Sequence, residues 1–149
     1  MLFCLLLLPL LSFPNNMYNN DNDAEILSFS KIQKNKHLFF KDFFYYLSNS
    51  QIHHIVDIKL KDYLLIDDFE HLRVGAIIRC LWMDNDREVD LKSPCIILDI
   101  KMNNNGISCK CKSIGKKTTF FHVTASDNCR IFQKLTVDNL VLLRALDNI

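Results

Sequence analysis

The sequence predicts an α+β protein in which an aromatic-rich N-terminal helix and a C-terminal helix accompany a small antiparallel β-barrel. Three observations lead to this prediction. Aromatic residues recur at helical spacing in Phe39–Leu47, five short apolar segments separated by turn residues follow Gly75, and leucines recur at helical spacing near the C-terminus. A chain of 149 residues has the size of one ordinary domain, so it can bury a core without a disulfide framework.

The composition is that of a globular protein, with 49% hydrophobic and 23% charged residues. The formal net charge of +1 predicts no global attraction to nucleic acid or to anionic membranes, so such binding would need a local cationic patch. Asn, Ile, Lys and Phe are frequent, whereas the chain has only 3 Gly and 3 Pro. The frequent residues have A/T-rich codons, which indicates an AT-rich genome such as those of several large DNA viruses, some protists and some low-GC bacteria.

The amino terminus carries the strongest localisation signal. Leu2–Phe13 is an apolar run that is too short to span a bilayer as a helix but has the length of a signal-peptide hydrophobic region. Three interpretations stay open, namely a signal peptide or short anchor, a translation start at Met17, and a packed hydrophobic arm. We therefore divide the chain into residues 1–16 as a leader or mis-assigned start, residues 17–69 as a helix and strand region, and residues 70–149 as the barrel with its closing helix.

The N-terminal region is expected to contain a strand, a helix and a second strand. Ala24–Ile32 alternates enough for a short strand or an extended arm, and residues 56–60 alternate as in a half-exposed strand. Between them, Phe39–Leu47 forms the predicted helix, which ends at the polar residues 48–50. Its aromatic face, which includes Phe43, favours burial against a β-core, with a surface for a partner as the alternative.

From Gly75 onward the sequence predicts a β-meander followed by a helix. The five predicted strands are GAIIRCLWM, CIILDIKM, ISCKCKS, TTFFHV and CRIFQK. Between the second and the third, NNNG supplies residues that tolerate positive φ in a tight hairpin turn. Closing such a sheet into a barrel would hide its edges. The tail TVDNLVLLRALDNI has an N-cap at Thr136 or Asp138 and leucines at helical spacing.

Three cysteines lie close to a run of lysines in the segment from Cys95 to Val123. In ISCKCKS, Cys109 and Cys111 share a strand face with Ile107, which favours small buried hydrophobic residues. Structural zinc usually needs two C-x2-4-C pairs and a reactive thiol usually needs a helix N-terminus, so we predict neither a metal site nor a redox site. Convergence of scattered cysteines on one ion is the minority alternative. Buried thiols are typical of a reducing compartment, which predicts an intracellular protein.

The histidines and glycines do not support an enzyme. His53 and His54 are adjacent, so on a strand they would point in opposite directions, and His37, His71 and His122 stand alone. The sequence contains no G-x-S-x-G, no H-E-x-x-H and no glycine-rich phosphate loop. We therefore predict no catalytic residue and no cofactor.

A lysine-rich stretch is the clearest candidate for a binding surface. No acidic residue occurs between Lys101 and Ser126, and the predicted hairpin places Lys110 and Lys112 on its outer face. Cations beside an aromatic ring are a common means of holding a nucleic-acid backbone and stacking a base. A solvated strand face is the plainer alternative. The predicted binding residues are Lys110, Lys112, Lys116, Lys117, Phe120, Trp82 and Phe43, with Trp82, the only tryptophan, as part of an aromatic cage for a peptide side chain.

Two motifs flank the predicted barrel. FEHLRVGAIIRCLW contains the pattern Leu-x-x-Gly-x-x-Ile-Arg, and CRIFQK contains Ile-Phe-x-Lys, at positions Leu72, Gly75, Ile78, Arg79, Ile131, Phe132 and Lys134. Over roughly residues 70–135 the chain thereby resembles the small SH3-like or Tudor-like barrels found in proteins of large nucleocytoplasmic DNA viruses. The resemblance implies a non-catalytic adaptor or virion-associated module in the host cytoplasm or the virion.

These observations favour a non-enzymatic protein-interaction or structural module, with Phe39–Leu47 or the open barrel edge as its surface. Nucleic-acid binding through the hairpin Lys110–Lys117 is the second hypothesis. The expected partner is another protein and no stable transmembrane span is expected. A secretory or membrane location follows only if Leu2–Phe13 is a genuine signal.

Overall fold

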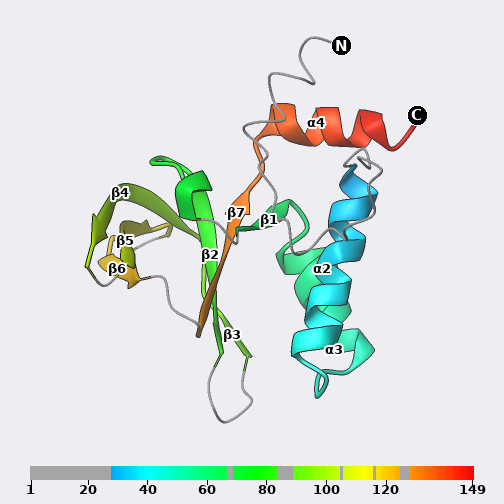
Figure 1. Ribbon diagram of the computed structural model, residues 1–149, viewed down its shortest axis with the longest axis horizontal. Coiled ribbons are helices and arrows are strands. Elements are labelled where there is room, and N and C mark those ends of the chain that lie inside the picture. The colour runs from blue at the N-terminus through cyan, green and yellow to red at the C-terminus, as the bar shows by residue number, and fades with distance from the viewer. Residues whose placement is uncertain (1–27, 67–68, 84–88, 105, 116, 125–127) are drawn as a thin grey trace. The chain divides into compact units, whose positions relative to one another are not determined.

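The computed structural model describes residues 28–66, 69–83, 89–104, 106–115, 117–124 and 128–149 (Figure 1). Over these residues the protein is α+β, with three α-helices and a seven-stranded antiparallel sheet that is not closed. The chain forms two compact units. The helical unit contains the described residues up to Leu64 together with Leu135–Ile149, and the sheet unit is Leu65–Lys134. The predicted leader, residues 1–16, lies outside the described residues.

The helical unit contains α2 (Phe29–Phe43), α3 (Asn49–His53), the π-helix η1 (His54–Lys59) and α4 (Val137–Leu146). All three α-helices in the described residues begin at a hydroxyl side chain that caps the first turn, and Ser48 caps α3. Ser28 accepts a hydrogen bond from the Lys31 amide at 3.3 Å, and Thr136 accepts one from the Asn139 amide at 3.2 Å. Thr136 is thus confirmed as the N-cap of the C-terminal helix. That helix had been grouped with the barrel, whereas the structure places it in the helical unit.

The predicted strands of the N-terminal region are wrong. Residues 29–32 form the first turn of α2, and residues 24–27 lie outside the described part of the chain. Residues 56–60 lie in η1 and its C-cap, because burial there follows a helical spacing: Ile52, Val56 and Leu60 are buried, whereas Ile58 is exposed. Five residues that alternate fit both the strand period of two and the helical period of about 3.6. A helix is distinguished from a strand only over a longer stretch, where buried residues recur at every fourth position.

The aromatic residues of α2 contribute mainly to a core. Phe39, Phe40 and Phe44 are buried, and the ring centroids of Phe40 and Phe44 lie 5.4 Å apart. Burying each such ring contributes roughly 1.5–3 kcal/mol of stability. The interpretation of this face as buried is confirmed for these rings, whereas Phe43 is 58% exposed. The helix itself ends at Phe43 and not at Leu47, with Phe44 as its C-cap.

All five strands predicted after Gly75 are present. They are β2 (Ile77–Met83), β4 (Cys95–Asn103), β5 (Gly106–Ser113), β6 (Phe120–Thr124) and β7 (Cys129–Lys134). The β4–β5 hairpin pairs Asn103 with Gly106, whose φ of 109° is the conformation expected of the NNNG turn. Two strands were not predicted, β1 (Tyr63–Ile66) at the boundary of the units and β3 (Val89–Leu91). A single 3-10 turn, η2 (Phe69–His71), precedes β2 in the described residues.

The closed SH3-like barrel is not confirmed. The strand order is β1-β7-β2-β4-β5-β6, with β3 paired to β2 beside this path. Strand β6 is therefore the last strand, and among the described strands it pairs only with β5. In Figure 1, β4, β5 and β6 curl away from β2 within the sheet unit. The sheet bends as a barrel would, but its last edge is left open.

Strand register sorts the side chains of the sheet unit onto two faces, because paired residues share a face and neighbours along a strand alternate. We call one the thiol face, since register joins Ile97 to Cys111 and Cys111 to Phe121. It comprises Ile78, Cys80, Trp82, Cys95, Ile97, Cys109, Cys111, Phe121, Val123, Cys129 and Ile131. The opposite face of β5 and β6, the lysine face, comprises Lys110, Lys112, Phe120 and His122.

No helix in the described ranges combines the length and the apolar character needed to cross a bilayer.

Candidate functional site

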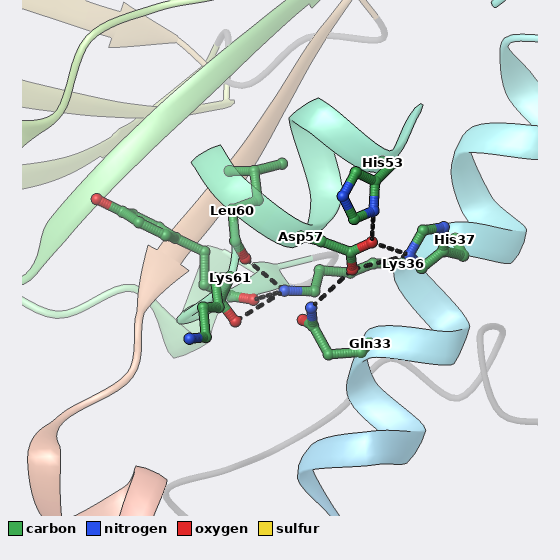
Figure 2. Close-up of polar contacts among 8 residues, drawn as sticks. Gln33, Lys36, His37, His53, Asp57, Leu60 and Lys61 are labelled. Atoms are coloured by element: carbon green, nitrogen blue, oxygen red, sulfur yellow. Dashed lines mark hydrogen bonds and ion pairs between the residues drawn. The ribbon is translucent and has the colours of Figure 1, made fainter. Parts of the chain in front are cut away.

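A buried lysine anchors the helical unit. The Lys36 side chain projects from the middle of α2 and is 1% exposed. Its ammonium group donates hydrogen bonds to the carbonyl oxygens of Leu60, of Lys61 at 3.3 Å and of Tyr63 at 3.0 Å. Figure 2 shows the side chain extended from α2 into the turn that follows η1. The ammonium group thus donates to carbonyls of the turn that joins η1 to β1.

The charge of Lys36 is costly where it lies. Burial lowers the pKa of Lys36 from 10.5 to about 7, although the carboxylates of Asp62 and Asp57 act in the opposite direction. The site therefore holds a lysine that changes protonation near neutral pH. All three of its donors are directed at backbone carbonyls, so the group serves as a structural bridge and has no free proton to offer a substrate.

Asp57 is the second polar centre of the helical unit. Its carboxylate contacts His37 Nε2 at 2.8 and 2.9 Å, His53 Nδ1 at 2.6 Å and the Gln33 side-chain amide at 3.2 Å (Figure 2). Partial burial raises the pKa of Asp57, but the hydrogen bonds from His37 and His53 outweigh it and hold this pKa below its usual value of 3.8. The carboxylate therefore joins α2, α3 and η1 through two imidazoles.

The polar groups of the helical unit, as far as the structure describes it, do not form a metal centre. Over the described residues, no three His, Cys, Asp or Glu side chains are grouped so that they could hold one ion. His37 and His53 contact Asp57 as hydrogen-bond partners, and a general acid-base role would also need a nucleophile or substrate site beside them. The network of Lys36 and Asp57 fits a structural role, in which buried polar groups specify how α2 and η1 pack.

The sheet unit contains a cavity of about 320 Å³ on its thiol face. The lining residues come from β2, from the β3–β4 connection and the start of β4, and from the end of β5 and β6. The lining residues are Cys80, Trp82, Lys92, Ser93, Pro94, Cys95, Ser113, Phe121, His122 and Val123. The volume is at the lower end of the range of small-ligand pockets and is large enough for one side chain of a partner.

Two aromatic rings make the cavity suited to an apolar or cationic side chain. Trp82 is 37% exposed and Phe121 is 38% exposed, although most of the thiol face around them is buried. Partly exposed rings on a concave apolar surface are typical of binding pockets, because they offer contact area at low conformational cost. At the rim, the Lys92 ammonium is neutralised by Asp90 at 2.5 Å.

The thiols beneath the cavity are chemically quiet. All five cysteines in the described residues are free and buried, and four of them form two hydrogen-bonded pairs, Cys80 with Cys129 and Cys95 with Cys111. The hydrogen bond to Cys129 and burial both raise the pKa of Cys80. The hydrogen bond to Cys95 and burial likewise raise the pKa of Cys111. Burial raises the pKa of Cys109 to about 11. The hydrogen bond with Cys111 lowers the pKa of Cys95, and the hydrogen bond with Cys80 lowers the pKa of Cys129, although burial acts in the opposite direction at both. All five thiols are nevertheless buried, which agrees with a packing role.

The lysine face brings together several of the residues predicted to bind nucleic acid. Register places Lys110 opposite His122 and Lys112 opposite Phe120, and the Lys110 ammonium lies 5.7 Å from the centre of the Phe120 ring. Phe120 is 60% exposed. Asp99 of β4 lies directly across from Lys110, so the cationic character of this face is partly neutralised.

The structure therefore divides the predicted site residues among separate places. Lys110, Lys112 and Phe120 share the lysine face, Trp82 lies on the thiol face, and Phe43 belongs to the helical unit. Lys117 is exposed at the β5–β6 turn, where its carbonyl accepts a hydrogen bond from Ser113 Oγ at 2.9 Å, and Lys116 lies outside the described residues. Sequence reasoning missed Phe121, Pro94 and Lys36. For Phe121 the signal was available, since it alternates with Phe120 along one strand.

Comparison with protein-family models, with curated proteins and with solved structures finds no match to this chain.

Proposed function

We propose that this protein is a non-enzymatic interaction module that holds a side chain of a protein partner in the cavity of the sheet unit. The observation that carries the proposal is the pairing of Trp82 and Phe121, both partly exposed, in a cavity whose floor is formed by the buried residues Cys80, Cys95 and Val123. A large ring left in water at the mouth of an apolar cavity gains free energy when a ligand covers it. An SH3-like adaptor, the class that the flanking motifs resemble, would use such a face.

The burial of the two thiols that line the cavity supports binding over catalysis. Cys80 and Cys95 line it, but Cys80 is held protonated and both thiols are buried. The exposed hydroxyl of Ser93 is suited to a hydrogen bond with a peptide backbone.

The proposal is tested with the full chain and a displayed library of random peptides. Selected peptides are synthesised and titrated while the emission of Trp82, the only tryptophan, is recorded. We expect a shift in emission on binding, and at least roughly tenfold weaker binding by Phe121→Ala, as expected for a central interface aromatic. Phe120→Ala is the matched control, because this ring lies on the opposite face of β6. Peptides that bind Phe121→Ala as well as the parent would contradict the proposal.

Nucleic-acid binding is the second candidate, and the row formed by Lys112 and Phe120 beside Lys110 and His122 favours it. Cations adjacent to an exposed ring can contact phosphates while a base stacks. The test is fluorescence anisotropy of a labelled 12-nucleotide single strand at rising salt. Binding through this face would weaken steeply with salt and would be lost in the double variant Lys110→Glu/Lys112→Glu. The control variant Lys34→Glu, in the helical unit, should bind the strand as well as the parent protein does. Binding that does not depend on salt would exclude the lysine face as the nucleic-acid site.

A further inference from the structure

The outer edge of β6 is an exposed backbone edge in the sheet unit. Strand β6 ends the strand order, and in the described part of the sheet its other side has no paired strand. An unpaired edge of this kind offers a row of N–H and C=O groups to another extended chain.

The hydrogen-bonding pattern tells which residues offer their backbone there. The Ser113 amide donates to the Thr119 carbonyl at 2.9 Å, so Thr119 directs its backbone toward β5. In an antiparallel pair this direction alternates, which turns Phe121 and Val123 toward β5 and leaves Phe120, His122 and Thr124 with backbone groups directed outward.

The cavity reaches this same edge. Phe121 and Val123 line it with side chains of the thiol face, but His122 also lines it although its side chain belongs to the lysine face. His122 therefore meets the cavity along its backbone. A chain paired with the outward groups of His122 would run past the cavity and place one of its side chains beside Trp82 and Phe121.

The charge around the edge selects the partner. Strands β5 and β6 and their connection contain lysines and no acidic residue, and Lys110, Lys112 and Lys117 are all within two strands of the free edge. At moderate salt the Debye length is ~8–10 Å, so the charges of these lysines act on a chain bound at the edge of β6. Asp99 of β4, directly across from Lys110, offsets one of these charges, and the charges that remain attract an acidic chain and repel a basic one.

We propose that the partner is an extended acidic peptide segment that adds as a strand to the free edge of β6 and inserts one apolar side chain into the cavity. This inference rests on the proposed function, because it names the ligand of the same cavity. It adds two features that the cavity alone does not require, namely backbone pairing with β6 and a negative charge on the partner.

The probes are blocked decapeptides that alternate glutamate with valine around one central phenylalanine. Two further versions carry N-methyl groups on the amides of alternate residues, one on the odd positions and the other on the even positions, and a last version has lysine for glutamate. Strand addition uses the N–H groups of one set only. We therefore expect one N-methylated version to bind at least ~tenfold more weakly and the other to bind like the parent, since losing interfacial hydrogen bonds costs about one order of magnitude in affinity.

The protein variants test the same contact from the other side. His122→Pro removes an outward N–H but leaves the β5–β6 ladder intact, since the amides of Phe121 and Val123 make that ladder. We expect His122→Pro to bind the parent peptide at least ~tenfold more weakly, and His122→Ala, the matched control that keeps the N–H, to change binding by less than ~threefold. Hydrogen exchange of the β5 amides verifies that the proline variant retains its sheet.

The outcomes separate the two proposals. Dependence on one methylation register, loss in His122→Pro and failure of the lysine peptide support strand addition. A Trp82 shift that Phe121→Ala abolishes but neither methylation register affects overturns strand addition and leaves the proposed function standing. Binding of library peptides without any preference for acidic sequences overturns the acidic partner. If sedimentation shows a dimer that His122→Pro abolishes, the occupant of the edge is a second copy of the chain, and the partner peptide is overturned. Displacement of the peptide by a single-stranded oligonucleotide would also overturn the partner peptide.

Discussion

Phe120 and Phe121 are neighbours in sequence but lie on opposite faces of β6. Phe120 has the Lys110 ammonium 5.7 Å from the centre of its ring, whereas Phe121 lines the cavity that it shares with Trp82. The strand thereby supplies one ring to each candidate surface. Any experiment that changes only one of the two rings reports on one surface.

A first prediction concerns these rings in the free protein. Phe121→Ser is expected to shift the emission maximum of Trp82 toward longer wavelength, because more water enters the cavity that both side chains line. Phe120→Ser is expected to leave the emission unchanged, because its side chain belongs to the lysine face. The measurement is tryptophan fluorescence at equal fold content, verified by circular dichroism. Equal shifts in both variants would show that the cavity is not organised by Phe121.

A second prediction concerns the buried lysine. Lys36→Met is expected to lower the free energy of unfolding at pH 9, where the buried amine is uncharged, by about 2 kcal/mol, because the carbonyls of Leu60 and Tyr63 lose a donor while staying buried. Lys34→Met on the exposed side of α2 is the control and should change stability by less than about 0.5 kcal/mol. Urea denaturation measures both. A stable Lys36→Met protein would mean that these carbonyls find other partners.

A third prediction is a rise in stability on the alkaline side of neutrality. The pKa of Lys36 is about 7 in the folded protein and 10.5 ordinarily, so between these pH values the unfolded chain binds a proton that the folded chain does not. The free energy of unfolding then rises with pH, by up to about 1.4 kcal/mol per pH unit for one group. Denaturation at pH 7, 8 and 9 measures this slope. Lys36→Met should lack it, and a slope that persists in that variant would assign it elsewhere.

A fourth prediction concerns acid stability. The pKa of Asp57 is held below 3.8 by His37 and His53, so its contribution is present above about this pH and is lost as the pH falls through the lower, folded value. Asp57→Asn should therefore reduce stability at pH 6 and flatten the loss of stability below pH 4. Asp42→Asn, at an exposed position of the same unit, serves as the control. Thermal melts across pH 2–6 give the comparison, and parallel curves for Asp57→Asn and the parent would contradict the assigned role.

A fifth prediction concerns the thiols of the sheet unit. Cys80, Cys109 and Cys111 are buried and have raised pKa values, so iodoacetamide at pH 8 is expected to modify them at least ~100-fold more slowly in the native protein than in urea. Peptide mapping by mass spectrometry resolves each position. Rapid native labelling of Cys111 would show that the thiol face opens to solvent.

Local patterns were sufficient for much of the sheet unit. The strands β2, β4, β5, β6 and β7 were predicted because each has apolar residues of strand-forming type between turn residues, and the alternation in ISCKCKS correctly buried Cys109 and Cys111. The helix α4 and its cap at Thr136 followed from equally local signals. The segment around Val56 was predicted wrongly because its few alternating residues also satisfy a helical spacing, and only packing within the helical unit selected η1.

By itself the sequence determined α4, the strands β2, β4, β5, β6 and β7, and the burial of Cys109 and Cys111, since these depend on residues near one another in the chain. Tertiary structure alone decided that Trp82 and Phe121 line one cavity while Lys110, Lys112 and Phe120 face the other way, because strand register and curl join distant segments. It also decided that Lys36, an ordinary helix lysine by sequence, is buried against carbonyls some 24 to 27 positions further along the chain. The open edge of β6 is also decided by the tertiary structure, because closure of a sheet depends on all its strands together.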